Sequence, residues 1–285
     1  MNEYSSIITT AIDLQKQGKL EEAASIYRRI LDIQPSHSGA LHLMGLIFHS
    51  KGNFQEAIEL FGKAIIQTPD VADFHSNMAA AQLTLGHANS AIRHAQKAIQ
   101  LDSKLGNAHY NLGNALFSLG ETYDAVSSFL RAVELNPKND EFWSNYLFAL
   151  NFSPSVDQSQ LFAANCDWAL SLGQNTTEIT FNNDLTPDRP ICLAYFLPEF
   201  DKHVTARFIK AMLKHHDREN FKILIYGFSE NRSAVPKSLS ENVDAWIDVS
   251  DLEAKLVAKK MRDDQVDILL HPCTFKARYR KLIVH

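Results

Sequence analysis

The sequence has few cysteines, and it has no long apolar run. Its three cysteines, Cys166, Cys192 and Cys273, form no CxxC pair. Their spacing excludes a disulfide scaffold and favours a reducing compartment. The longest apolar run, near 41–48, is much shorter than the roughly 20 residues that a membrane helix needs. The N-terminal segment also lacks the basic start of a signal peptide. We therefore expect a cytoplasmic protein that binds no membrane.

Glycine-rich phosphate loops and metal-binding motifs are also missing. No GxGxxG or GxxxxGK motif follows a strand-like segment, and no HExxH motif or His–Cys cluster occurs. We therefore expect neither a metal site nor a covalently bound cofactor. The net charge of −5 is uneven, because residues 1–189 carry 12 Lys and Arg against 20 Asp and Glu, whereas residues 190–285 carry 16 against 13. An acidic first part argues against electrostatic binding of nucleic acid.

What the sequence does contain is a 34-residue repeat. Glycines, alanines, aromatic residues and closing prolines each recur at this spacing, and the glycine series is Gly18, Gly52, Gly86 and Gly120. We predict two helices in each unit, the first ending at the glycine and the second before the proline. The period is that of the tetratricopeptide repeat. It predicts an α-solenoid over 1–152, with repeats at about 4–37, 38–71, 72–105 and 106–139 and a fifth first helix.

One register of the first helices carries asparagine. Asn77, Asn111 and Asn145 are spaced by 34 residues, so stacked repeats would align their amides along a groove. An amide offers both a donor and an acceptor, and it can therefore pair with a peptide bond whatever the peptide's side chain. Asp73 lies four residues before the first asparagine, on the same side. We interpret these four residues as a peptide-binding groove; the alternative is that the amides bond neighbouring helices.

The histidines of the repeats follow no metal-binding pattern. His42 and His49 are two helical turns apart, and His75 and His109 occupy a register that often holds an aromatic residue. We expect them to pack in the core or to line the groove rather than to bind a metal.

The pattern changes after residue 152. Residues 153–189 are predicted to form a helical connector and a polar linker. From residue 190, apolar runs alternate with amphipathic segments, which predicts strands and helices in alternation and a partial, Rossmann-like α/β domain over 190–285. Ligands in such a fold bind beyond the carboxyl ends of the strands. The predicted strands are 191–197, 221–228, 245–249 and 266–270, and the predicted helices are 205–216 and 252–262.

Several segments resemble one family. The stretch "NLGNALFSLGETYDAVSSFLRAVELNPKNDEFWSNYLFALNF" is similar to the end of the repeats in bacterial protein O-linked N-acetylglucosamine transferases, the Spindly-like group. "PDRPICLAYFLPEFDKHVTARFI" resembles the start of their catalytic region, and "LKHHDRENFKILIYGFS" and "VDILL" continue the resemblance. The resemblance implies a solenoid followed by a glycosyltransferase lobe. It implies sugar transfer from a donor of the UDP-N-acetylglucosamine type to Ser or Thr hydroxyls of a protein held in the groove.

The resemblance also implies one catalytic residue. His203 matches the family histidine that follows the first catalytic strand, and an imidazole can relay a proton near neutral pH. The chain departs from the family pattern at Glu199, where the family has aspartate. It departs again at "HPCTFKARYR", where the family has a Gly-His-Thr or Gly-Tyr-Thr turn and only Thr274 and Arg278 could correspond.

The family continues into a second lobe that supplies most donor-binding groups, whereas this sequence stops at His285. The resemblance therefore implies the first lobe alone, inactive as this fragment. We expect a protein or peptide partner in the groove, and we leave open a homodimer or a separate subunit that supplies the second lobe. The alternative function is a nonenzymatic adaptor that joins proteins through its repeats.

Overall fold

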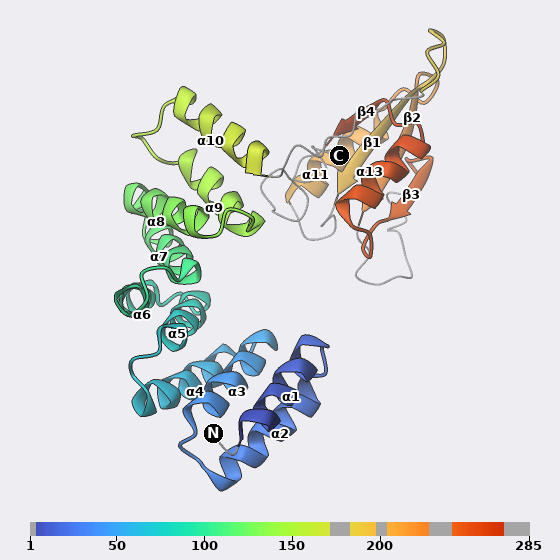
Figure 1. Cartoon of the computed structure of the whole chain (residues 1–285). Helices are drawn as coiled ribbons and strands as arrows, with labels where there is room; N and C mark the ends of the chain where they lie inside the picture. The colour runs from blue at the N-terminus through green and yellow to red at the C-terminus, as the bar shows by residue number, and fades with distance from the viewer. Residues whose placement is uncertain (1–3, 172–182, 198–203, 228–240, 271–285) are drawn as a thin grey trace. The chain divides into compact units, whose positions relative to one another are not determined.

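The computed structural model divides by its internal contacts into two units, Met1–Cys166 and Asp167–His285. The division falls within helix α10 (Gln158–Ser171). Each unit is described by itself (Figure 1). No helix in the described part of the chain combines the length and the apolar character needed to cross a membrane. The structure describes residues 4–171, 183–197, 204–227 and 241–270.

The first unit is a stack of helix pairs joined by short turns (Figure 1). The helices α3, α5, α7 and α9 begin 34 residues apart, so the period of the sequence is the period of the structure. This confirms the predicted solenoid of tetratricopeptide repeats. The pairs are α1 (Ser5–Lys16) with α2 (Leu20–Ile33), α3 (Ser38–Ser50) with α4 (Phe54–Gln67), α5 (Ala72–Thr84) with α6 (Ala88–Leu101) and α7 (Gly106–Ser118) with α8 (Thr122–Leu135), and α9 (Asp140–Leu150) follows.

The glycine series ends the first helix of each repeat, as predicted. All four glycines have φ angles between 79° and 81°, in the left-handed region where a β-carbon would be strained. These positions are Gly18, Gly52, Gly86 and Gly120.

Within a repeat, the two helices cross closely at one small residue. A β-carbon built on Gly113 would lie only 2.7 Å from the ring of Phe129, so this crossing needs glycine. The equivalent pair in the preceding repeat is Ala79 and Ala95, and both are fully buried in one cluster. A larger residue on the first helix thus accompanies a smaller one on the second. This exchange of volume accompanies the interruption of the aromatic register at Ala95, whereas the first repeat packs Ala11 with Tyr27.

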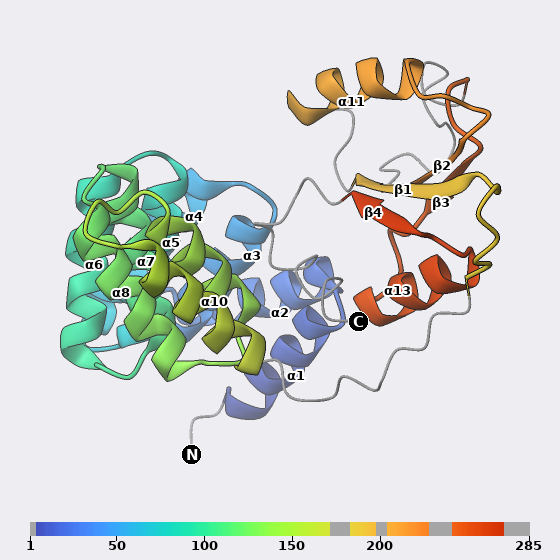
Figure 2. The ribbon, with the colours of Figure 1, turned by 90° about the horizontal axis from the view of Figure 1, so that it is seen from above.

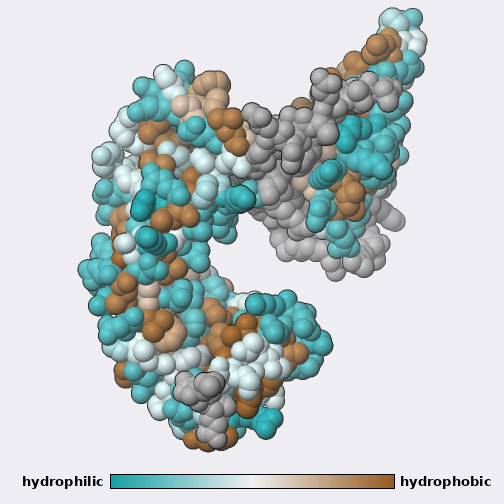
Figure 3. All heavy atoms as spheres, viewed as in Figure 1, coloured by the Kyte–Doolittle hydropathy of each residue, from teal (hydrophilic) through white to brown (hydrophobic). Residues whose placement is uncertain are grey.

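We call the stacked helices of the first unit the array, and its helices α3, α5, α7 and α9 the inner wall. Each contacts the next directly, while α4, α6 and α8 lie behind them (Figure 1). The space-filling view shows the array hollowed on this side (Figure 3). The sequences of these four helices contain no lysine and no arginine. The inner wall is therefore a surface of neutral, aromatic and acidic side chains.

The second unit is a small sheet with a helix on each face (Figure 2). The described strands are all parallel, in the order β3-β2-β1-β4, which confirms the predicted α/β fold. Predicted boundaries are correct to within two residues. The elements are β1 (Ile191–Leu197), α11 (Val204–Lys214), β2 (Phe221–Gly227), β3 (Ala245–Asp248), α13 (Ala254–Asp263) and β4 (Ile268–Leu270).

Alternate residues of β1 bury against the two helices. Ala194 and Phe196 lie in the cluster that contains Val257 of α13. Leu193 and Tyr195 belong instead to the cluster that contains α11 residues. A strand buried on both faces reads as a continuous apolar run, which is why the sequence predicted β1 at its observed bounds.

Candidate functional site

The predicted asparagine row lies on three successive helices of the inner wall. The amide nitrogen of Asn77 donates to Nε2 of His42 at 2.8 Å. The amide nitrogen of Asn111 donates to the main-chain oxygen of Ser76 at 2.9 Å and to its hydroxyl at 3.2 Å. Each asparagine therefore reaches back to the preceding inner-wall helix, as the neighbouring-helix alternative proposed.

The third asparagine makes the same backward contact within a larger network. Nδ2 of Asn145 donates to the hydroxyl oxygen of Tyr110 at 2.9 Å and to Oδ1 of Asn114 at 2.8 Å. The hydroxyl of Tyr110 in turn donates to Glu141 at 2.8 Å. Burial raises the pKa of Tyr110, so this hydroxyl keeps its proton and remains a donor.

These partners fix the direction of the amides. The carbonyl of Ser76 can only accept, and the single proton of Tyr110 is already directed at Glu141. Both contacts therefore require the nitrogen side of the asparagine. In the described part of the array, no hydrogen bond reaches the Oδ1 atoms of Asn77, Asn111 or Asn145. The row presents acceptors; its use by a peptide stays a prediction.

Asp73 is exposed in the first turn of α5. The same register holds Asn107, also exposed, and Glu141, which binds Tyr110. The Lys- and Arg-free inner wall thus carries carboxylates only near helix starts, where they also complement the helix dipole. A contact between Asp73 and a bound peptide stays a prediction.

The histidine register has a structural explanation. The ring N–H groups of His75, His109 and Trp143 each donate to the main-chain carbonyl six residues earlier, at 2.9, 3.1 and 2.8 Å. Histidine therefore replaces tryptophan as the donor that ties each first helix to the turn before it. Among the residues that the structure describes, no group of three or more His, Cys, Asp or Glu side chains could hold a metal ion.

His42 supports the first member of the row. It is buried and packs against Phe74, with ring centroids 4.5 Å apart. Burial lowers the pKa of His42 to about 4. The imidazole is therefore neutral near pH 7, and its Nε2 can accept from Asn77.

Three phenylalanines form a group at α7 and α9, the last two helices of the inner wall. Phe117 of α7 lies 5.8 Å from Phe148 of α9 and 5.7 Å from Phe152, between ring centroids, and Phe148 lies 4.8 Å from Phe152. This group could not be predicted from the sequence, because the repeat equivalents of Phe117 and Phe148 are the asparagines Asn151 and Asn114. A cluster that breaks the repeat leaves no periodic signal.

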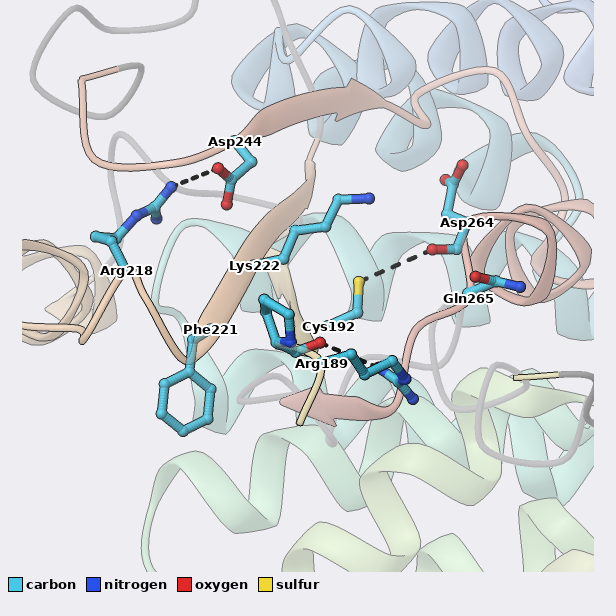
Figure 4. Close-up of a pocket in the computed structure, with 9 residues that line it drawn as sticks. Arg189, Cys192, Arg218, Phe221, Lys222, Asp244, Asp264 and Gln265 are labelled. Carbon is cyan, nitrogen blue, oxygen red and sulfur yellow. Dashed lines mark hydrogen bonds and ion pairs between the residues drawn. The ribbon is translucent and has the colours of Figure 1, made fainter. Parts of the chain in front are cut away.

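The second unit has a pocket of about 380 Å³ at the amino edge of its sheet (Figure 4). Ligands in parallel sheets bind at the opposite, carboxyl edge. Arg218 pairs with Asp244 at 2.6 Å, so this charge is already neutralised. We assign the pocket a structural role. It is lined by Arg189, Pro190, Cys192, Arg218, Phe221, Lys222, Asp244, Asp264 and Gln265.

Beside this pocket, one carboxylate fastens the linker to the sheet. Asp267 forms two hydrogen bonds of 2.6 Å with Arg189 and accepts from the main-chain N–H of Cys192 at 2.8 Å and from Asn183 at 2.7 Å. These contacts, led by Arg189, hold the pKa of Asp267 well below its usual range. We call this group the Asp267 clasp.

The predicted catalytic residue, His203, lies outside the described residues, as do Glu199, Thr274 and Arg278. In the sequence, position 203 falls between the carboxyl end of β1 and the first residue of α11. Its catalytic role stays a prediction.

Comparison with protein families identifies the repeats. The tetratricopeptide repeat family matches residues 106–139, and a second TPR repeat family matches residues 45–86. Among curated proteins, the chain is 27% identical over 150 residues to the probable UDP-N-acetylglucosamine–peptide N-acetylglucosaminyltransferase SPINDLY of Oryza sativa. It is 28% identical over 142 residues to SPINDLY of Arabidopsis thaliana. The matches cover 51% and 48% of this chain but only 16% of either relative.

Solved structures support the fold. A point mutant of the Thermobaculum terrenum O-GlcNAc transferase matches with a TM-score of 0.56 and 24% identity, covering 94% of this chain and 46% of its own. A double mutant of MamA from RS-1 matches with a TM-score of 0.52 and 16% identity, covering 60% of this chain and 96% of its own. The chain thus contains tetratricopeptide repeats, has low-identity similarity over about half its length to SPINDLY proteins, and shares its fold with the O-GlcNAc transferase structure.

Proposed function

We propose that this chain holds an extended polypeptide along its inner wall and presents it to the α/β unit as the acceptor of a protein O-glycosyltransferase. The observation that carries the proposal is the direction of the asparagine row, which the partners of Asn111 and Asn145 fix. Three successive helices each hold an amide by its nitrogen, and in the described part of the array no hydrogen bond reaches its oxygen. Asn77 and Asn145 are partly exposed, whereas Asn111 is 8% exposed. An extended peptide offers main-chain N–H donors irrespective of its sequence.

The energetics suit a site that tolerates many sequences. A hydrogen bond between neutral groups contributes about 0.5–1.5 kcal/mol after exchange with water. Three such bonds would supply about 2–4 kcal/mol, which corresponds to millimolar binding at best. Useful affinity therefore needs further contacts with side chains. Asp73, exposed beside the row, is proposed to make one of them.

The names of the relatives support the transferase part of the proposal. The curated relatives are named as probable peptide N-acetylglucosaminyltransferases, and the O-GlcNAc transferase structure aligns with 94% of this chain. On this basis the donor is proposed to be of the UDP-N-acetylglucosamine type, bound beyond the carboxyl ends of the parallel strands. His203, which follows β1 in the sequence, is proposed to relay a proton there.

A nonenzymatic adaptor is the second candidate. It is favoured by the matches to the tetratricopeptide families, which fall within the repeats alone. In this case the inner wall would join proteins, and the α/β unit would serve only as a structural or docking element.

The peptide part is tested by selecting binders to the full chain from a random 12-residue phage library and measuring their affinity as synthetic peptides. Because each asparagine supplies a hydrogen bond, replacing Asn77, Asn111 and Asn145 together by alanine should raise the dissociation constant at least tenfold. The control is Asn89→Ala, an exposed asparagine of the outer helix α6. A circular dichroism melt checks that each variant is folded. Unchanged affinity in the folded triple variant contradicts the proposal.

The transferase and the adaptor are separated by calorimetric titration with UDP. Saturable heat that is lost in His203→Ala supports the transferase. Peptide binding without any saturable heat from UDP leaves peptide binding as the function of this chain, whether or not a second lobe completes a transferase.

A further inference from the structure

The three rings of Phe117, Phe148 and Phe152, which we call the phenylalanine cluster, join two inner-wall helices. Phe117 belongs to α7, Phe148 to α9 and Phe152 to the turn after α9. The rings contact one another, with centroids 4.8–5.8 Å apart. Phe117 also packs against the buried core of its repeat, so the cluster has a fixed base.

The outermost ring of the cluster remains largely in water. Phe152 is 55% exposed, although it contacts two other rings. Burial of aromatic surface is favourable, and aromatic rings dominate the energetics of many protein interfaces. A bulky apolar side chain resting on this ring would remove apolar surface from water on both partners.

The charges of the inner wall select the kind of partner. Its four helices carry three carboxylates, Asp73, Asp140 and Glu141, and neither lysine nor arginine. In the repeats that contain these helices, the lysines and arginines lie on the second helices or in the turns between helices. The wall is therefore complementary to a positively charged ligand and disfavours an acidic one. An arginine can also stack on an exposed aromatic ring.

We propose that the phenylalanine cluster receives a bulky apolar side chain of a positively charged, extended peptide lying along the inner wall. This inference rests on the proposed peptide-binding function and adds the ligand's chemistry to it. The asparagine row bonds the peptide main chain, the cluster takes an aromatic or large aliphatic side chain, and the carboxylates favour neighbouring arginine or lysine.

The test uses the full chain and the same random 12-residue library. We expect selected peptides to be enriched in Phe, Trp or Leu together with Arg or Lys. Their dissociation constants should rise about tenfold in Phe152→Ala, because the exposed ring supplies the contact. Phe162→Ala is the matched control, since Phe162 is a 72% exposed phenylalanine of α10 outside the cluster. It should change affinity by less than about twofold. Binding should also weaken in 0.5 M NaCl.

Four results would overturn the inference. Selected peptides that lack bulky apolar residues, or that bind Phe152→Ala as tightly as the native chain, overturn the role of the cluster but leave the peptide-binding proposal standing. A library that yields no binder overturns both. A dimer in analytical ultracentrifugation that dissociates in Phe152→Glu identifies a second copy of this chain as the occupant. Because Phe152 is exposed, these substitutions do not depend on repacking a core.

Discussion

The two units differ in the kind of polar contact that stabilises each of them internally. In the array, the hydrogen bonds of the asparagine row join neutral side chains and main-chain groups 31 or 35 residues apart, and they recur from one repeat to the next. In the α/β unit, the Asp267 clasp is ionic and joins segments 78 and 84 residues apart. The array is thus stabilised repeat by repeat, whereas the sheet depends on a few contacts that close long stretches of chain.

Because the two units are stabilised by separate contacts, a destabilising substitution in one unit should leave the other unit folded. A substitution in a repeat acts on that repeat and its neighbours, while loss of the clasp acts on the sheet. Hydrogen exchange can follow the main-chain amides of both units in one sample.

The largest effect is expected for Gly113→Val. A β-carbon at this position would lie 2.7 Å from the ring of Phe129, so the two helices must separate. We expect the array to lose about 3 kcal/mol of unfolding free energy, measured by urea denaturation. The matched control is Gly62→Ala, whose β-carbon would meet Met78 at an ordinary 3.7 Å. It should be neutral or slightly stabilising. A loss below about 1 kcal/mol in Gly113→Val contradicts the account of the helix crossing.

Asp267→Asn should destabilise the α/β unit by about 2 kcal/mol, because one partner of a partly buried ion pair is removed. Amides of β1 and β2 should exchange faster, while those of α3 to α8 keep their native rates. The exposed Asp263→Asn serves as the control. Faster exchange throughout the array as well would show that the two units are not stabilised independently.

Acid should weaken the array through His42. Its pKa falls from 6.5 to about 4 on folding, so between these values the unfolded chain binds a proton that the folded chain does not. Stability is then fully present above pH 6.5 and falls as the pH approaches 4. After allowance for incomplete burial, the loss is about 2 kcal/mol. His42→Gln, which keeps an acceptor for Asn77, should remove this part of the pH dependence, and the control His109→Gln should retain it. Identical pH profiles for His42→Gln and the native chain would contradict the assignment.

The array could be predicted from the sequence because the same residue pattern recurs in successive repeats. The helix bounds, the turn glycines and the alignment of Asn77, Asn111 and Asn145 all follow from one period. The atoms that hold the asparagines could not be predicted. Their partners differ at each step, from an imidazole to a main-chain carbonyl to a phenol, and the choice depends on side-chain orientation.

In the second unit, continuous apolar runs predicted the strands but not what joins them. Arg189 and Asp267 lie in segments that resemble a known family. Nothing in the sequence, however, indicates that two residues 78 positions apart form an ion pair. The phenylalanine cluster was missed for the opposite reason. It lies within a repeat pattern, but its members Phe117 and Phe148 depart from that pattern.

The central claim is that the inner wall binds the main chain of an extended peptide through the asparagine oxygens. The most direct measurement is an N-methyl scan of a selected 12-residue peptide, in which each main-chain N–H is removed in turn. We predict that methylation at up to three spaced positions raises the dissociation constant about tenfold each, and that one of these effects disappears in Asn111→Ala. Affinities that stay within about twofold of the native peptide at every position would contradict the claim.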